Sequence, residues 1–138
     1  MVGVLLLTHG STGQALLDAA DHVLGSHQTN ARALAILPQD DPTEILQRAR
    51  AELADIEDDA GAIIFVDIFG ATPSNIGARL LQPGRVEGIA GVSLPMLVRA
   101  MAYRHLPLAQ VVIRAMEAGT RGQINMKEDA CNAATGGS

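Results

Sequence analysis

The chain has 138 residues, of which 48% are apolar and only 2% aromatic, and its formal net charge is −5. This length and composition are typical of one compact domain. The shortage of aromatic side chains and the acidic balance argue against nucleic-acid binding, which relies on base stacking and on a basic surface. The apolar run VGVLLL is far shorter than the roughly 20 residues of a membrane span, and the single cysteine, Cys131, has no disulfide partner within the chain. We therefore expect a soluble cytoplasmic domain over residues 1–129 and a flexible tail over residues 130–138.

Short apolar runs and helical periodicity alternate along the chain. The run at 2–7 predicts a buried strand, and the glycine-containing turn after it leads into a helix over 12–24. Asp41 and Pro42 have the residue types of a helix N-cap and first position, and Thr72 and Pro73 repeat this pattern. The remaining predicted strands cover residues 31–37, 62–66 and part of 85–92, and the remaining helices cover 42–56, 73–81, 95–103 and 107–118.

The alternation of strands and helices predicts an α/β fold. We expect a doubly wound, mostly parallel sheet of four strands in the order 2-1-3-4, with helices on both faces. In this order the chain changes direction between strands 1 and 3, and ligands of such sheets bind beyond the carboxyl ends of the strands at that point. His9 ends strand 1, and Asp67 and Thr72 follow strand 3. The three residues are therefore predicted to meet.

Their chemistry favours a phosphoryl group. A carboxylate that accepts a hydrogen bond from one imidazole nitrogen fixes the other nitrogen as a nucleophile, so Asp67 is the residue expected to orient His9. The hydroxyl of Thr72 and the free backbone N–H groups at the start of the third helix suit a bound anion. We predict no metal or cofactor, because the sequence has no cysteine pair and no histidine pair at ligand spacing. His22, His27 and His105 are expected to be solvated or structural.

Other functions remain open on these residues alone. A phosphatase of the mutase type also carries a histidine after its first strand, but an arginine precedes that histidine where this chain has Thr8. A small chelatase of tetrapyrrole synthesis begins with a similar strand ending in His-Gly-Ser, and it needs a second histidine for its metal. A regulatory module without catalysis is the third alternative, since a phosphorylated histidine can itself be a signal.

Three segments carry a family resemblance: LLLTHG at residues 5–10, VDIFGATPSN at 66–75 and IAGVSLPML at 89–97. Together, in this order, they resemble the IIA component of the mannose/fructose class of the bacterial phosphoenolpyruvate-dependent phosphotransferase system. The resemblance extends from residue 1 to about residue 126.

The resemblance implies a role for each matching residue. His9 matches a histidine that receives a phosphoryl group on Nε2 from the phosphocarrier protein HPr and passes it to a IIB component. Asp67 matches the aspartate that orients this histidine, and Thr72 matches a hydroxyl residue that donates to the phosphoryl group. The supporting positions of the two motifs are Thr8, Gly10, Gly70, Ala71, Pro73, Ser74 and Asn75.

The family resemblance also implies a homodimer that exchanges a C-terminal strand, for which residues 122–127, GQINMK, are the candidate. Phe69 stands where a tryptophan is common in the family, and Ser93 where an asparagine is common. No IIB domain follows in this sequence, so we expect transfer to a separate IIB chain or a role in regulation. Contact with a membrane is expected only through a IIC/IID transporter partner.

Overall fold

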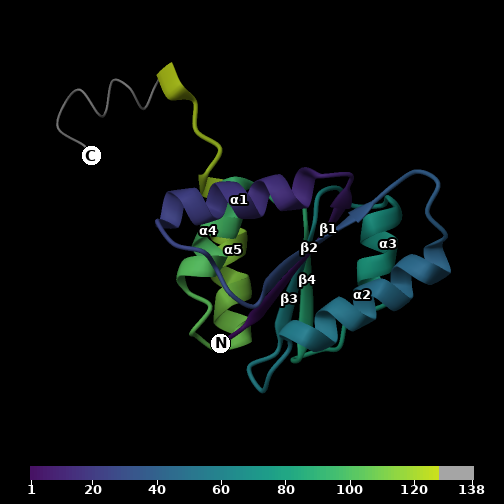
Figure 1. The fold of residues 1–138 in the computed structure, drawn as a ribbon. Helices are drawn as coiled ribbons and strands as arrows, with labels where there is room; N and C mark the ends of the chain where they lie inside the picture. The colour runs from purple at the N-terminus through teal and green to yellow at the C-terminus, as the bar shows by residue number, and fades with distance from the viewer. Residues whose placement is uncertain (128–138) are drawn as a thin grey trace.

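The structure, a computed structural model, describes residues 1–127, so Cys131 and the predicted tail lie outside the described residues. Its centre is a parallel sheet of four strands in the order β2-β1-β3-β4. The strands are β1 (Gly3–His9), β2 (Ala31–Ile36), β3 (Ala62–Val66) and β4 (Val86–Ala90). The predicted fold class and strand order are confirmed (Figure 1).

Helices cover both faces of this sheet (Figure 1). On one face lie α1 (Thr12–Leu24), α4 (Leu94–Ala102) and α5 (Leu108–Arg121), and on the other lie α2 (Pro42–Ile56) and α3 (Thr72–Ala78). Val4 and Leu6 of β1 belong to the first core, whereas Leu5 and Leu7 belong to the second. Since side chains alternate between the two faces of a strand, a strand buried on both faces reads as a nearly continuous apolar run.

The helix boundaries differ from the predicted ones at α3 and α5. Thr72 is the first residue of α3, and the extended N-cap position belongs to Ala71. The sequence pattern placed the cap one residue late because a threonine before a proline is also typical of an N-cap. Helix α3 ends at Ala78 rather than at residue 81, and α5 continues to Arg121.

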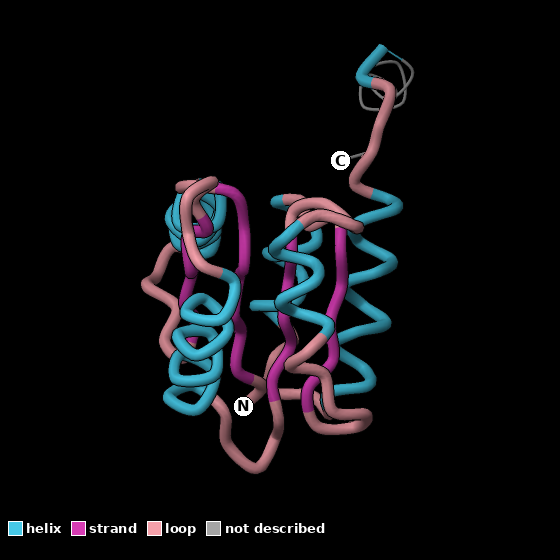
Figure 2. The backbone as a smooth tube through the Cα atoms, turned by 90° about the vertical axis from the view of Figure 1, so that its right-hand side faces the viewer, coloured by secondary structure: helices cyan, strands magenta, loops and turns pink. Residues whose placement is uncertain are grey.

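The predicted C-terminal strand is not formed by the single chain. Residues 123–125 are irregular and residues 126 and 127 are helical. Figure 2 shows this segment leading away from the sheet after α5. A strand exchanged between two chains needs a partner chain to pair with, so it stays a prediction. In the part of the chain that the structure describes, no helix is both long and apolar enough for a membrane span.

The arrangement of β1 and β3 sets the position of the predicted site. His9 is the last residue of β1, where it pairs with Ile36 of β2, and Asp67 comes directly after β3. Gly10 adopts a φ of 52°, a value that favours glycine, and the chain turns there toward α1. Neighbouring parallel strands therefore deliver His9 and Asp67 to the same edge of the sheet.

Candidate functional site

His9 and Asp67 form a close pair across the β1–β3 boundary. Oδ2 of Asp67 lies 2.9 Å from Nδ1 of His9 and accepts the backbone N–H of His9 at 2.9 Å. The other carboxylate oxygen accepts the backbone N–H of Ile68 at 3.0 Å. Both oxygens of Asp67 are therefore engaged, and the carboxylate is fixed relative to the ring.

This geometry selects one form of the neutral imidazole. Because a carboxylate accepts hydrogen bonds, Nδ1 of His9 carries the proton and Nε2 keeps its lone pair. The His9 side chain is 55% exposed, whereas that of Asp67 is only 18% exposed. Burial by itself would raise the pKa of Asp67, but the hydrogen bonds from the backbone and ring of His9 outweigh it and hold the pKa below its ordinary value. The carboxylate thus stays charged at neutral pH.

An open groove begins at the His9 ring. Its volume is about 680 Å³, and Thr72 of α3 and Gly10 contribute to its wall. The opposite wall comes from the end of β2 and the loop that leads into α2. The residues that line it are His9, Gly10, Ile36, Leu37, Pro38, Asp40, Pro42 and Thr72. None of them carries a positive charge, so a bound anion would depend on hydroxyl and backbone donors.

Thr72 can supply such a donor. Among residues 1–127, no side chain caps the start of α3, because Ala71 holds the N-cap position. Gly70 has a φ of 86°, which turns the segment between Asp67 and the helix. The hydroxyl of Thr72 and the first N–H groups of α3 therefore remain available to a ligand in the groove.

Two of the predicted supporting residues lie away from the groove. Thr8 is fully buried, and its hydroxyl accepts the backbone N–H of Gly13 at 2.7 Å, so it fixes the start of α1. Ser74 lines a separate apolar pocket beside β4. Pro73 is buried and begins the helix together with Thr72, and Asn75 is exposed.

The second wall of the groove was not predicted from the sequence. Asp40 accepts the backbone N–H of Leu37 at 2.8 Å and donates its own backbone N–H to Leu37 at 3.1 Å, which closes a tight turn. This turn follows β2 and brings Leu37 and Pro38 to the groove. The position of this turn directly after β2 could have predicted its place at the groove, since every loop after a parallel strand reaches the same edge of the sheet.

The protein has a second histidine–aspartate pair, His27 and Asp21, with the same geometry as His9 and Asp67. Nδ1 of His27 lies 2.9 Å from Oδ2 of Asp21, whose other oxygen accepts the N–H of Gln28 at 3.0 Å. Acidic Asp18 and Glu52 line the pocket beside this pair. The pairing geometry is therefore not unique to His9, and the groove with Thr72 is the distinguishing feature. In the described chain, no group of three or more metal-ligating side chains is placed to hold a metal ion.

Comparisons with known proteins agree with this architecture. A family model described as "PTS system fructose IIA component" matches residues 3–117. The mannose-specific EIIAB component of Escherichia coli K12 is 29% identical over 124 residues, which cover 88% of this chain and 38% of that protein. The fructose-specific EIIA component of Bacillus subtilis is 28% identical over 114 residues, which cover 81% of this chain and 77% of that protein. The chain thus spans well under half the length of the E. coli relative.

Solved structures share the fold. A phosphotransferase system EIIA component from Streptococcus agalactiae superposes with a TM-score of 0.82 at 17% identity, covering 93% of this chain and 99% of that one. A mannose/sorbose-specific IIA subunit from Enterococcus faecalis gives 0.80 at 16% identity, covering 90% and 93%. The family model covers most of the sequence and includes both His9 and the segment from Asp67 to Asn75. The chain therefore belongs to the EIIA-man family, the mannose/fructose IIA components of the phosphotransferase system.

Proposed function

We propose that His9 accepts a phosphoryl group on Nε2 from phosphorylated HPr and passes it to a IIB component on a separate chain. The observation that carries this proposal is the His9–Asp67 pair, which leaves Nε2 unengaged on a ring that lines a groove together with Thr72. Membership of the EIIA-man family supports it. The protein would act in the cytoplasm and meet a membrane only through a IIC/IID transporter.

The transfer is a displacement at phosphorus. Nε2 of His9 forms the new N–P bond while the bond between phosphorus and the donor atom breaks, and that electron pair leaves with the donor. The imidazole gains positive charge in this step, and the ionised, partly buried Asp67 stabilises it through the hydrogen bond to Nδ1. Thr72 and the N–H groups of α3 would donate to the phosphoryl oxygens. Helix α3 has only seven residues, so these direct hydrogen bonds supply most of the stabilisation.

The experiment follows label from phosphoenolpyruvate. The purified chain is incubated with labelled phosphoenolpyruvate, enzyme I and HPr, and the protein-bound label is tested for stability in acid and base. We expect acid-labile, base-stable label on the wild type and none on His9→Ala. The matched control is His27→Ala, because His27 has the same pairing geometry without the groove. An unlabelled wild type, or label retained by His9→Ala, contradicts the proposal.

A regulatory output is the second candidate, since the phosphorylated His9 site could itself be read by a partner. The two outputs are separated by adding a IIB component to the labelled protein. Loss of label from this chain with gain on IIB favours transport, and label that stays on this chain favours regulation.

We also propose that the chain forms a homodimer through the β4 edge. Exposed apolar side chains include Phe69 and Leu81, which line the pocket beside β4, two residues of α5 and two of the segment after it: Ile113, Met116, Ile124 and Met126. Exposed apolar surface that gathers into a patch is typical of an interface. Deleting residues 122–138 is expected to give monomer or aggregate in sizing experiments. A stable dimer after this deletion would place the interface elsewhere.

A further inference from the structure

The His9 groove carries negative charge without a matching positive one. Among the described residues that line it, Asp40 is the only one with a fixed charge, apart from the His9 ring itself. Asp67 adds a second carboxylate at that ring. Helix α3 contains no charged residue, and the first turn of α2 adds only the acidic Glu44. A phosphoryl group on Nε2 would therefore face carboxylates and no positively charged side chain of the described groove.

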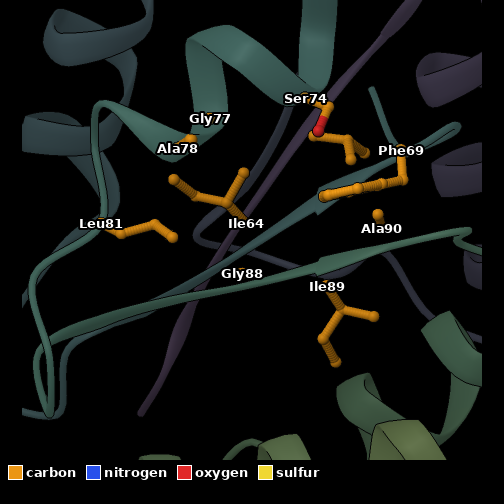
Figure 3. A pocket seen from close by; sticks show the side chains of 10 residues that line it. Ile64, Phe69, Ser74, Gly77, Ala78, Leu81, Gly88, Ile89 and Ala90 are labelled. Carbon is orange, nitrogen blue, oxygen red and sulfur yellow. The ribbon is translucent and has the colours of Figure 1, made fainter. Parts of the chain in front are cut away.

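The other side of the segment from Asp67 to Thr72 offers no cation either. A small apolar pocket lies there, between α3 and the ends of β3 and β4, and Figure 3 shows Phe69 and Ser74 beside it. Within residues 1–127, none of the side chains that line this pocket is charged. Hydroxyl and backbone N–H donors would therefore have to hold the phosphoryl group without a counter-charge from either side.

Asp40 is held in place by the peptide group that joins Ile36 to Leu37. Its Oδ2 atom accepts the N–H of this peptide at 2.8 Å, and the carbonyl of the same peptide accepts the backbone N–H of Gly10 at 3.0 Å. A single planar peptide thus separates the Asp40 carboxylate from the residue that follows His9. His9 and Ile36 are also partners in the register of β1 and β2. The carboxylate is therefore a fixed charge close to His9.

A fixed negative charge at this place acts on the phosphorylated form of His9. A phosphoryl group carries nearly two negative charges at neutral pH. Because Asp40 and His9 line one groove of about 680 Å³, that group and the carboxylate lie within roughly 10 Å, about one Debye length at 0.1 M salt. Their repulsion is absent before phosphorylation, so it raises the free energy of the phosphorylated protein alone.

We propose that Asp40 sets the phosphoryl-transfer potential of His9: its charge destabilises phospho-His9 and so keeps the phosphoryl group transferable to the next acceptor. This inference rests on the phosphoryl-transfer function proposed above. The N–P bond of phospho-His9 breaks as the acceptor forms its own bond to phosphorus, and the electron pair returns to Nε2. Asp40 takes part in neither bond and acts only through its electric field.

The equilibrium constant for exchange with HPr measures this effect directly, because it depends on the two separate proteins and not on how they dock. Labelled phosphorylated HPr is mixed with the full chain, and the ratio of label is also approached from labelled chain and free HPr. The mixtures contain about 0.01 M or about 1 M salt, where the Debye length is about 30 Å or 3 Å. The contribution of HPr cancels in the ratio of variant to wild type.

The first variant is Asp40→Asn, which removes the charge while its amide oxygen can still accept the N–H of Leu37. The matched control is Asp59→Asn. Asp59 is exposed and precedes β3, at the opposite end of the sheet from the groove, so this change alters the net charge equally. Circular dichroism and urea denaturation check that both variants are folded.

A second pair of variants changes the charge of the groove without touching Asp40. Leu37 lines the groove, is 44% exposed and binds Asp40 through its backbone, so its side chain can be replaced. Leu37→Lys places a positive charge in the groove, and Leu37→Gln is the neutral control. The lysine should shift the equilibrium in the same direction as Asp40→Asn, and the glutamine should leave it near that of the wild type.

We expect Asp40→Asn to shift the equilibrium toward the phosphorylated chain by about three- to tenfold at low salt and by less than about twofold at high salt. Asp59→Asn should match the wild type. An equal shift in Asp59→Asn, or a shift that persists at high salt, overturns the proposal. Slower transfer by Asp40→Asn with an unchanged equilibrium also overturns it and assigns Asp40 to the docking of HPr. A wild type that takes up no label contradicts the phosphoryl-transfer function and this inference with it, whereas a labelled wild type with an unchanged Asp40→Asn equilibrium contradicts only the inference.

Discussion

A single oxygen of Asp67 accepts two hydrogen bonds from His9, one from the ring and one from the backbone, each at 2.9 Å. The carboxylate therefore fixes the imidazole relative to the strand from which it projects, in addition to selecting its tautomer. Asp67 can do this because β1 and β3 are neighbours and parallel, so their carboxyl ends lie side by side. The orientation of His9 is set by the sheet rather than by a flexible loop.

Replacing Asp67 with asparagine tests this role. Asparagine keeps the size of the side chain but removes the negative charge that stabilises the imidazolium. We expect Asp67→Asn to take up label from phosphorylated HPr more slowly, by about 10- to 100-fold, the range known for metal-binding histidines that lose their orienting carboxylate. Rapid-quench labelling measures the rate, and circular dichroism checks that the fold is intact.

The control for this substitution is Asp21→Asn. Asp21 holds His27 with the same 2.9 Å pairing distance, so it matches the chemistry of the change at a pair outside the groove. Its labelling rate should equal that of the wild type. An unchanged rate for Asp67→Asn would remove Asp67 from the mechanism.

Stability should depend on pH through the same carboxyl. The pKa of Asp67 in the folded protein lies below its ordinary value, despite burial, because of the hydrogen bonds from His9. Its contribution is therefore complete above the unfolded pKa of about 3.9 and is lost as the pH falls through the lower folded pKa. We expect the wild type to exceed Asp67→Asn in free energy of unfolding at pH 6 by more than at low pH. Urea titrations of both proteins between pH 2.5 and 6 measure this difference.

Other carboxyl groups with lowered pKa values do not affect the difference in free energy of unfolding between the wild type and Asp67→Asn. The pKa of Asp21 is lowered chiefly by the N–H of Gln28, and that of Asp58 chiefly by the N–H of Ala60. Both groups are the same in the two proteins, so their contributions cancel in the difference. A difference that does not change with pH would show that the charge of Asp67 contributes nothing to folding.

The sequence predicted the strand order and the meeting of His9, Asp67 and Thr72 because these depend on patterns with a fixed physical meaning. A short apolar run such as residues 2–7, bounded by a glycine-containing turn, is typical of a strand buried on both faces, and its apolar side chains are all buried. Because the strands are parallel, the loops that follow their carboxyl ends all lie at the same edge of the sheet. The turn at Leu37–Asp40 was missed because it depends on the Asp40 carboxylate accepting the backbone N–H of Leu37, a contact that no periodicity reveals.

Two residues of the motifs lie away from the groove, although they are neighbours of the site residues in sequence. Thr8 and Ser74 stand beside His9 and within the segment of Thr72, but consecutive residues of a strand or helix point in different directions. Thr8 consequently faces the core and Ser74 faces the apolar pocket. Long-range contacts such as that of Arg104 with Val2 cannot be read from local sequence at all.

The buried hydroxyl of Thr8 gives a prediction about stability. Thr8→Val keeps the shape of the side chain but leaves the backbone N–H of Gly13 without its 2.7 Å acceptor. An unsatisfied buried donor costs about 1–3 kcal/mol, so we expect the free energy of unfolding to fall by that amount. Urea denaturation measures it. Thr8→Ser, which keeps the hydroxyl and loses the methyl group, is the control. A smaller loss in Thr8→Val than in Thr8→Ser would mean that packing of the methyl group outweighs the hydrogen bond.

Arg104 gives the last prediction, because it is a charged residue with only 4% of its surface exposed. Its guanidinium donates to the backbone carbonyls of Val2, Thr29 and Asn30, which lie at the starts of β1 and β2. Arg104→Met fills similar volume but leaves these acceptors without their donors. Since hydrogen bonds to charged groups are worth roughly 1.5–3 kcal/mol each, we expect a loss of at least about 3 kcal/mol in the free energy of unfolding.

The matched substitution is Arg99→Met, because Arg99 is exposed and lies near the same end of α4. It should change the free energy of unfolding by less than about 0.5 kcal/mol. The folded fraction of Arg104→Met should still take up label on His9 at the wild-type rate, because the carbonyls that Arg104 holds lie at the opposite ends of the strands from the groove. Equal stability of the two variants would show that the three hydrogen bonds of Arg104 add nothing to folding. A slower labelling rate in the folded fraction of Arg104→Met would show that the two ends of the sheet are coupled.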